Sequence, residues 1–121
     1  MIIYTAGDMH SGWQDALVAL LPAGTTVYDP RRSGLSDPAA YTRWDLEHVA
    51  RADAVIAFMG PENRSGFGLC VEVGYARASG KRVVFVDQLG RDWRSPLFDI
   101  VRHTASVVVP TLRDAVEWVL S

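Results

Sequence analysis

The residue best suited to chemistry in this sequence is Glu72, a single carboxylate within the apolar, small-residue stretch GFGLCVEVGYARASGK. The stretch predicts a buried helix in which Gly66, Gly68 and Gly74 let neighbouring backbone come close. Burying a carboxylate costs free energy unless charge or hydrogen bonds compensate it. A carboxylate in such a place is more often functional than structural, although the dipole of a helix N-terminus could also favour it. Glu72 is therefore the first candidate for a catalytic residue.

A second candidate is Asp45, which lies beside the apolar stripe formed by Leu46 and Val49 in a predicted helix. This position could direct the Asp45 carboxyl group toward the end of a sheet. Spacing alone favours a solvated aspartate with a local partner such as Arg43 or His48. Both interpretations stay open at the level of sequence.

Two glycine-containing loops carry the other polar candidates. The first loop contains Gly7, Asp8, His10 and Ser11, and the second contains Asn63, Ser65, Gly66 and Gly68. Backbone N–H groups at a helix start attract phosphate or sugar hydroxyls, and glycines allow a ligand to approach closely. The first loop could equally be a simple turn capped by Ser11. It matches neither a dinucleotide fingerprint nor a Walker motif.

Metal and serine-nucleophile chemistry have little support in the sequence. His10, His48 and His103 are far apart and form no HxxxH or HxH pair, and Cys70 is the only cysteine. No GxSxG motif provides a nucleophilic serine. We therefore expect neither a metal ion nor a cofactor.

Composition predicts one soluble domain that spans residues 1–121. Hydrophobic residues make up 49% of the chain and charged residues 21%, which is ordinary for a globular protein. A net charge of −2 gives no large basic surface for a nucleic acid polymer. The N-terminus lacks a signal-peptide pattern, and no apolar run approaches the roughly 20 residues of a membrane helix. We therefore expect a cytoplasmic protein that binds neither nucleic acid nor membrane.

Five short apolar runs alternate with five helical patterns along the chain. The predicted strands are 1–5, 25–28, 54–58, 82–86 and 106–109, and the predicted helices are 12–21, 38–51, 68–79, 96–103 and 111–120. The predicted N-caps are Ser11, Asp37, Ser95 and the pair Pro110-Thr111. Continuous apolar strands with right-handed crossovers predict a three-layer α/β fold. Its five-stranded parallel sheet has the order 2-1-3-4-5 with helices on both faces, as in flavodoxin-like and Rossmann-like proteins.

In such a sheet, ligands bind beyond the carboxyl ends of the strands, near the switch point between the first and third strands. The loops expected at that edge are 6–11, 60–67 and 87–94, which carry Gly, Asp, His, Asn, Arg and Ser. The loops at the opposite edge, such as 22–24 and 80–81, are short. We therefore expect the site over the first and third strands.

With these elements in order, residues 4–86 resemble the nucleoside 2-deoxyribosyltransferase family, which includes the 2′-deoxynucleoside 5′-phosphate N-hydrolases. The first motif is the strand end Ile3-Tyr4-Thr5-Ala6-Gly7. The second is Asp45-Leu46 upstream of Ala52-Asp53-Ala54-Val55-Ile56-Ala57. The third and most specific is Gly68-x-x-x-Glu72-x-Gly74-Tyr75-Ala76, followed by Gly80-Lys81 and an apolar strand. The C-terminal part of the chain matches only in general shape.

The resemblance implies that Glu72 is a nucleophile that attacks C1′ of a nucleoside or nucleoside 5′-monophosphate and forms a glycosyl-enzyme ester. Water or a second base would then resolve the ester. Tyr4 would hold the Glu72 carboxylate or the sugar, and Asp45 would face the base. The first loop and the turn 66–68 would receive the sugar and its 5′ end. Family sites are often completed by a neighbouring subunit, so a homo-oligomer is expected.

One position departs from the transferase pattern. Transferases usually have an aspartate six residues before the glutamate, where it serves protonation of the base, and this chain has Gly66 there. Hydrolases tend to have a serine near this point to bind the 5′-phosphate, and Ser65 is adjacent. The resemblance therefore favours hydrolysis over transfer. The proton donor stays open among Asp8, Asp45 and Glu62.

Two alternative functions and one question about oligomerisation remain. A non-catalytic nucleotide-binding or sensing module on the same fold would account for the missing aspartate, because fold does not fix function. The related lysine-decarboxylase-like phosphoribohydrolases carry Pro-Gly-Gly-x-Gly-Thr-x-x-Glu, and this chain lacks the Pro-Gly-Gly and the Thr. Finally, Trp93, Phe98 and Trp118 could form an apolar patch for oligomerisation or could complete the core.

Overall fold

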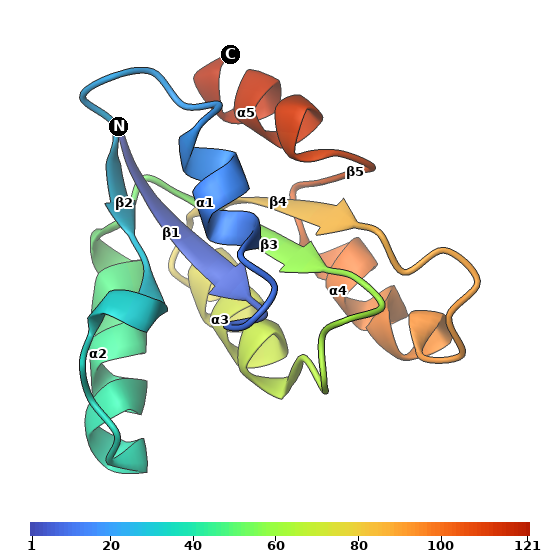
Figure 1. Cartoon of the computed structure of the whole chain (residues 1–121), viewed down its shortest axis with the longest axis horizontal. Helices are drawn as coiled ribbons and strands as arrows, with labels where there is room; N and C mark the ends of the chain where they lie inside the picture. The colour runs from blue at the N-terminus through green and yellow to red at the C-terminus, as the bar shows by residue number, and fades with distance from the viewer.

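A computed structural model describes all 121 residues as a three-layer α/β fold (Figure 1). The strands are β1 (Ile2–Gly7), β2 (Thr26–Tyr28), β3 (Ala54–Met59), β4 (Arg82–Asp87) and β5 (Val107–Val109). They form one parallel sheet in the order β2-β1-β3-β4-β5, which confirms the predicted topology. The inner strands are continuous apolar runs because helices cover both of their faces.

The helices lie on both faces of the sheet (Figure 1). They are α1 (Trp13–Val18), α2 (Pro38–Arg51), α3 (Phe67–Ala78), α4 (Asp99–Thr104) and α5 (Leu112–Leu120), with short 3-10 helices η1 (Pro30–Arg32) and η2 (Ser95–Phe98). Helices α1 and α5 cover one face, and α2, α3 and α4 cover the other. None of them combines the length and the apolar character that crossing a membrane requires.

The starts of the helices confirm two of the four predicted caps. Asp37 and Thr111 each accept a hydrogen bond from a backbone N–H in the first turn of their helix. Ser11 is not a cap, because α1 begins after Gly12, whose left-handed backbone (φ 79°) forms the turn. Ser95 is not a cap either, because it is already the first residue of η2.

The alternation of side chains along β1 decides which residues reach the candidate site. Ile3 packs with α1 and α5, whereas Tyr4 and Ala6 belong to the core beneath α2, α3 and α4. Tyr4 is fully buried and pairs in register with Val55 of β3. Its side chain therefore lies in the same layer as α3.

Helix α3 is buried on its inner face only, whereas the sequence predicted a buried helix. Glu72 lies on its inner face at 8% exposure, but Phe67, Val71 and Tyr75 are 79%, 58% and 40% exposed. The helical period of 3.6 residues turns this apolar row away from the sheet. No atom lies within 4 Å of the place where a Cβ on Gly74 would be, so that glycine does not serve a close approach.

The three aromatic residues considered for an apolar patch do not behave alike. Phe98 is 3% exposed and completes the core. Trp118 packs partly buried beneath Arg82, whose guanidinium carbon lies 4.3 Å from the indole ring centroid. Only Trp93 is freely exposed, at 79%. A patch made from these three side chains is therefore absent.

Candidate functional site

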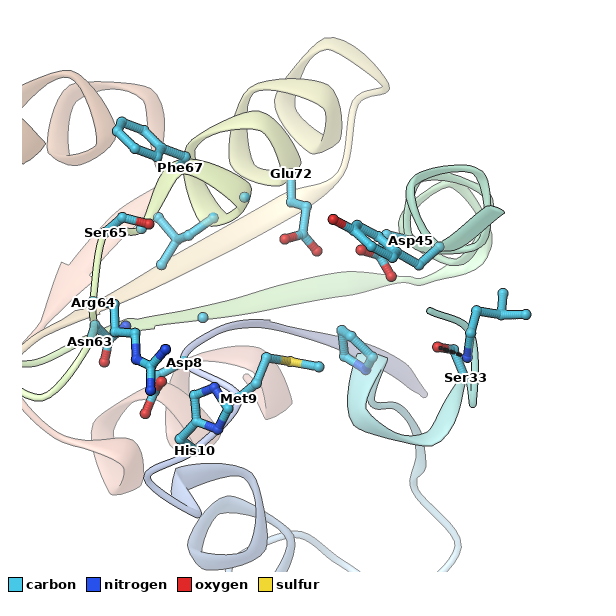
Figure 2. Close-up of a pocket in the computed structure, with 17 residues that line it drawn as sticks. Asp8, Met9, His10, Ser33, Asp45, Asn63, Arg64, Ser65, Phe67 and Glu72 are labelled. Carbon is cyan, nitrogen blue, oxygen red and sulfur yellow. Dashed lines mark hydrogen bonds between the residues drawn. The ribbon is translucent and has the colours of Figure 1, made fainter. Parts of the chain in front are cut away.

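A cavity of about 370 Å³ opens at the carboxyl ends of β1 and β3 (Figure 2). Seventeen residues line it. They are Gly7, Asp8, Met9 and His10 after β1; Pro30, Ser33 and Leu35 after β2; Tyr41 and Asp45 on α2; and Asn63, Arg64, Ser65, Gly66, Phe67, Gly68, Leu69 and Glu72 after β3. The cavity therefore lies at the predicted switch point of the sheet.

Two walls of the cavity differ from the sequence prediction. The segment after β2, with Leu35 and the α2 residue Tyr41, lines the cavity and was not predicted. The position of β2 beside β1 in the sheet is the signal that could have identified it, because both strands end at the same edge. The loop 87–94 was expected at the site, but none of its residues lines the cavity.

Glu72 is buried, as its apolar surroundings predict, and its carboxyl group points into the cavity (Figure 2). Gly68 lies one helical turn earlier, and a Cβ on it would come within 3.5 Å of Glu72 Oε1. The glycine thus leaves the carboxyl group accessible from the cavity. Burial raises the pKa of Glu72 to about 8; the Tyr4 hydroxyl acts to lower it, and the Asp45 charge acts to raise it.

Tyr4 reaches the same point from β1, beneath α3. Burial raises the pKa of its phenol far above the usual range, and the nearby Glu72 and Asp45 carboxylates raise it further. The phenol therefore stays protonated and can donate a hydrogen bond. Tyr4 Oη and Glu72 Oε2 are both buried without a hydrogen-bond partner of standard geometry, so the phenol is available to donate to the carboxylate. Of the two residues, only Glu72 lines the cavity.

Asp45 is brought to the site by α2, where it lies one turn after Tyr41. Burial raises the pKa of the Asp45 carboxyl group, while the Tyr4 hydroxyl and the His48 charge act to lower it. It is half-buried, forms no ion pair with Arg43 or His48, and lines the cavity. Figure 2 shows the Asp45 and Glu72 carboxyl groups directed into the same part of the cavity.

An aromatic stack supports this part of α2. The His48 ring stacks on Trp44 with 3.6 Å between centroids and meets Tyr28 edge-on at 4.7 Å. His48 Nδ1 lies 2.7 Å from the Trp44 carbonyl oxygen. These contacts fix the turn of α2 that carries Asp45.

The β1–α1 loop contributes fewer residues to the cavity than predicted. Asp8 Oδ2 accepts a hydrogen bond from the Ser11 N–H at 2.7 Å, and the Asp8 carbonyl accepts from Trp13 Nε1 and Gln14 Nε2. Asp8 and the exposed His10 do line the cavity. Ser11 does not, and it lies with Glu62 in a second cavity of about 320 Å³. The structure therefore separates both Ser11 and Glu62 from the candidate site.

Several predicted binding residues hold the loops in shape. Asn63 is 3% exposed; its Nδ2 donates to the Phe58 carbonyl at 3.1 Å, and its Oδ1 accepts from the Gly60 N–H. A Cβ on Gly7 would come within 2.4 Å of the Phe58 carbonyl oxygen, so only glycine fits where the end of β1 pairs with Phe58 of β3. Of the second loop, the exposed Ser65 keeps its side chain free for a ligand.

The arrangement suits nucleophilic attack on a carbon that develops positive charge. Glu72 can supply a carboxylate, Tyr4 can orient it, and the raised pKa of Asp45 fits a proton donor. No group of three or more His, Cys, Asp or Glu side chains is arranged to hold a metal ion.

Comparison with known proteins identifies the family and supports the fold. Residues 1–90 match the family model described as nucleoside 2-deoxyribosyltransferase like. A 2-deoxyribosyltransferase from Bacillus psychrosaccharolyticus has a similar structure, with a TM-score of 0.73 and 21% sequence identity over 96% of this chain and 90% of that one. A CMP N-glycosidase from Clostridium botulinum gives a TM-score of 0.65 at 18% identity over 98% of each chain. A comparison with curated proteins finds no significant match.

Proposed function

The chain belongs to the nucleoside 2-deoxyribosyltransferase-like family, and on this basis we propose that it cleaves the N-glycosidic bond of a nucleoside or nucleoside 5′-monophosphate through Glu72. The observation that carries the proposal is the position of the Glu72 carboxyl group, which is 8% exposed and directed into a 370 Å³ cavity. The two similar structures, a 2-deoxyribosyltransferase and a CMP N-glycosidase, support this class of reaction and substrate.

In the first step the Glu72 carboxylate attacks C1′ while the C1′–N bond breaks and its electron pair moves to the base. Asp45 donates the proton that the departing base requires. The raised pKa of its carboxyl group and its direction into the cavity support this role over Asp8, whose carboxylate is held by the Ser11 N–H. Tyr4 holds the attacking carboxylate by donating its hydroxyl proton.

In the second step a water molecule attacks C1′, its proton passes to the Asp45 carboxylate, and the ester bond to Glu72 breaks. Both carboxyl groups then return to their initial protonation states. The buried negative charge of Glu72 also stabilises the positive charge that develops at C1′ in both transition states.

The lining of the cavity supports one orientation of the substrate. One end carries Ser65, the side chain of Arg64 and the first N–H groups of α3, which suit a 5′-hydroxyl or phosphate. None of the ion pairs in the structure uses Arg64. The other end carries Ser33 and Asp45, and the lining residues Leu35 and Tyr41, which lie near them in sequence, add an apolar and aromatic surface for a base. Glu72 lies between the two ends in Figure 2.

Hydrolysis is proposed in preference to transfer because of Gly66. The backbone of Gly66 is left-handed (φ 81°), and a Cβ there would come within 2.7 Å of the Phe98 ring. An aspartate of the transferase type does not fit this position. The adjacent Ser65 supports recognition of a 5′ end instead.

We also propose a homo-oligomer that covers the outer face of α3. Phe67, Val71 and Tyr75 form its exposed apolar row, and Phe67 also lines the cavity. The neighbouring segment of η2 and α4 exposes Leu97 and Ile100 at 63% and 71%. A second copy on this face would shield these side chains and close the cavity beside Phe67.

The test is a mass-spectrometric screen for free base across nucleosides, deoxynucleosides and their 5′-monophosphates. At least one compound should release base, and Glu72→Gln should abolish release while the protein stays folded. Full turnover by Glu72→Gln would rule out the nucleophile. Thermal stabilisation by a nucleotide without any released base would favour a non-catalytic binding module instead.

A further inference from the structure

The β3–α3 loop, which forms one wall of the cavity, is held from outside by Arg94. Arg94 follows β4, and its side chain is only 11% exposed. It donates to the carbonyl oxygens of Pro61 at 2.8 Å and Arg64 at 3.3 Å, and also to that of Asn63. One side chain, about thirty positions later in sequence, thus binds three backbone carbonyls of the loop.

The remaining N–H groups of Arg94 are occupied by Asp92. Arg94 Nε donates to Asp92 Oδ1 at 2.9 Å, and an Nη2–H donates to Asp92 Oδ2 at 3.0 Å. The Arg94 backbone N–H also donates to Asp92 Oδ1, at 2.9 Å. A guanidinium has five N–H groups, and these contacts use all of them. Arg94 therefore has no donor left for a ligand, and Asp92 neutralises its charge.

The residues whose carbonyls Arg94 binds belong to the cavity wall or lie next to it in sequence. Asn63 and Arg64 line the cavity, and the chain continues through Ser65 to Gly66, where α3 begins. From the same β4–α4 segment, Phe98 packs against Gly66. Arg94 and Phe98 together fix both halves of the loop, so the position of Ser65 and of the α3 N-terminus depends on them.

We propose that Arg94 is a positioning residue for substrate binding, which it serves by holding the loop 61–66 against the β4–α4 segment without touching the substrate. This inference rests on the proposed function of the cavity. Loosening the loop should weaken binding at Ser65 and the α3 N-terminus. It should leave the chemical step intact, because Glu72, Tyr4 and Asp45 lie on α3, β1 and α2 and make no contact with Arg94.

The variant Arg94→Lys tests this arrangement, because one ammonium group cannot reach Asp92 and three carbonyls together. Arg102→Lys is a matched control. Arg102 binds Asp87, Asp99 and the Ser95 carbonyl in a comparable way but makes no contact with the β3–α3 loop. Both substitutions should lower the thermal stability, and only the first should open the loop.

Two measurements follow on both variants. Hydrogen exchange should show faster exchange of the amides of 63–68 in Arg94→Lys than in Arg102→Lys. With the most active of the common ribo- and deoxyribonucleoside 5′-monophosphates, Arg94→Lys should raise KM about tenfold or more, with little change in kcat or in the pH profile. Arg102→Lys should leave KM near that of the wild type.

The outcomes distinguish a failure of the positioning role of Arg94 from a failure of the proposed function of the cavity. Equal loop exchange in both variants, or an equal rise of KM in both, would overturn the positioning role. A fall in kcat with unchanged KM would also overturn it. If the wild-type protein neither releases base from these nucleotides nor is stabilised by them, the proposed function fails and the positioning role fails with it. If the nucleotides stabilise the wild-type protein but no base is released, the nucleotide dissociation constant of each variant replaces KM in the same comparison.

Discussion

The ring of Phe98 lies so close to Gly66 that a Cβ on the glycine would come within 2.7 Å of Phe98 Cζ. Phe98 is buried in the core and follows β4, whereas Gly66 is the cap of α3 in the cavity wall. The absence of the aspartate that transferases carry at this position is thus built into the packing of the core. In the reaction that we propose, the proton for the base therefore comes from another residue, and the direction of Asp45 into the cavity supports that residue.

The first prediction tests this packing. Gly66→Ala should destabilise the protein by about 1–3 kcal/mol more than Gly24→Ala, because overpacking adds to backbone strain. Both glycines have left-handed backbones (φ 81° and 89°), but Gly24 has no atom within 4 Å of a Cβ position. Urea unfolding gives the two free energies. Equal losses of stability in the two variants would show that the Phe98 ring moves aside for the new Cβ at no cost in free energy.

The second prediction concerns the pH dependence of the reaction. A nucleophilic Glu72 must be ionised, and its pKa in the free protein is about 8. Because the reaction also needs Asp45 to be protonated, kcat/KM should be bell-shaped, and the ionisation of Glu72 near pH 8 should set one of its two limbs. Initial rates at limiting substrate between pH 5 and 9 provide the check. A value of kcat/KM that is flat across this interval would contradict the assignment.

The third prediction uses the two neighbours of Glu72, which act on its pKa in opposite directions. Tyr4→Phe removes a hydroxyl that lowers the pKa of Glu72, so the limb of the kcat/KM profile that Glu72 sets should move to higher pH. Asp45→Asn removes a charge that raises the pKa of Glu72, so kcat/KM should rise with pH at lower pH values than 8. The rate itself should be much lower, because the proposed proton donor is lost. Shifts of the two profiles in the same direction would be inconsistent with this cluster.

The fourth prediction links the same pKa to stability. The pKa of Glu72 is raised from 4.5 to about 8 in the folded protein, so folding loses stability as pH rises from about 4.5 to about 8. Glu72→Gln removes that loss. Its stability should match the wild type near pH 4 and exceed it by about 3 kcal/mol at pH 7, given about 1.4 kcal/mol for each pKa unit. Chemical denaturation across this interval measures the difference, and a constant difference would mean that folding does not raise the pKa of Glu72.

The fifth prediction concerns assembly. Val71→Glu should convert the oligomer to monomers, because it introduces a charge into the exposed apolar row of α3. Val18→Glu is the control, since Val18 is 49% exposed on α1, across the sheet from α3. Light scattering on both variants gives the mass. A monomeric wild-type protein, or equal dissociation of both variants, would contradict an interface on α3.

The sequence by itself determined the sheet order and the burial of Glu72. Both follow from local patterns, since apolar runs alternate with helices and one carboxylate interrupts an apolar helix face. The cavity that Glu72 lines also lies at the predicted edge of the sheet, because the carboxyl ends of parallel strands meet at one edge. The caps at Ser11 and Ser95 failed because the turns there are set by Gly12 and by the start of η2, which local sequence does not reveal.

Only the tertiary structure decided which polar residues meet. Tyr4, Asp45 and Glu72 come from β1, α2 and α3, and crossovers bring them together. Asn63 was predicted to bind substrate, but its side chain is used by the turn after β3. Arg94 had no visible role in the sequence, because its partners are backbone carbonyls some thirty residues earlier. Backbone acceptors carry no residue signature, so such contacts appear only once the chain is folded.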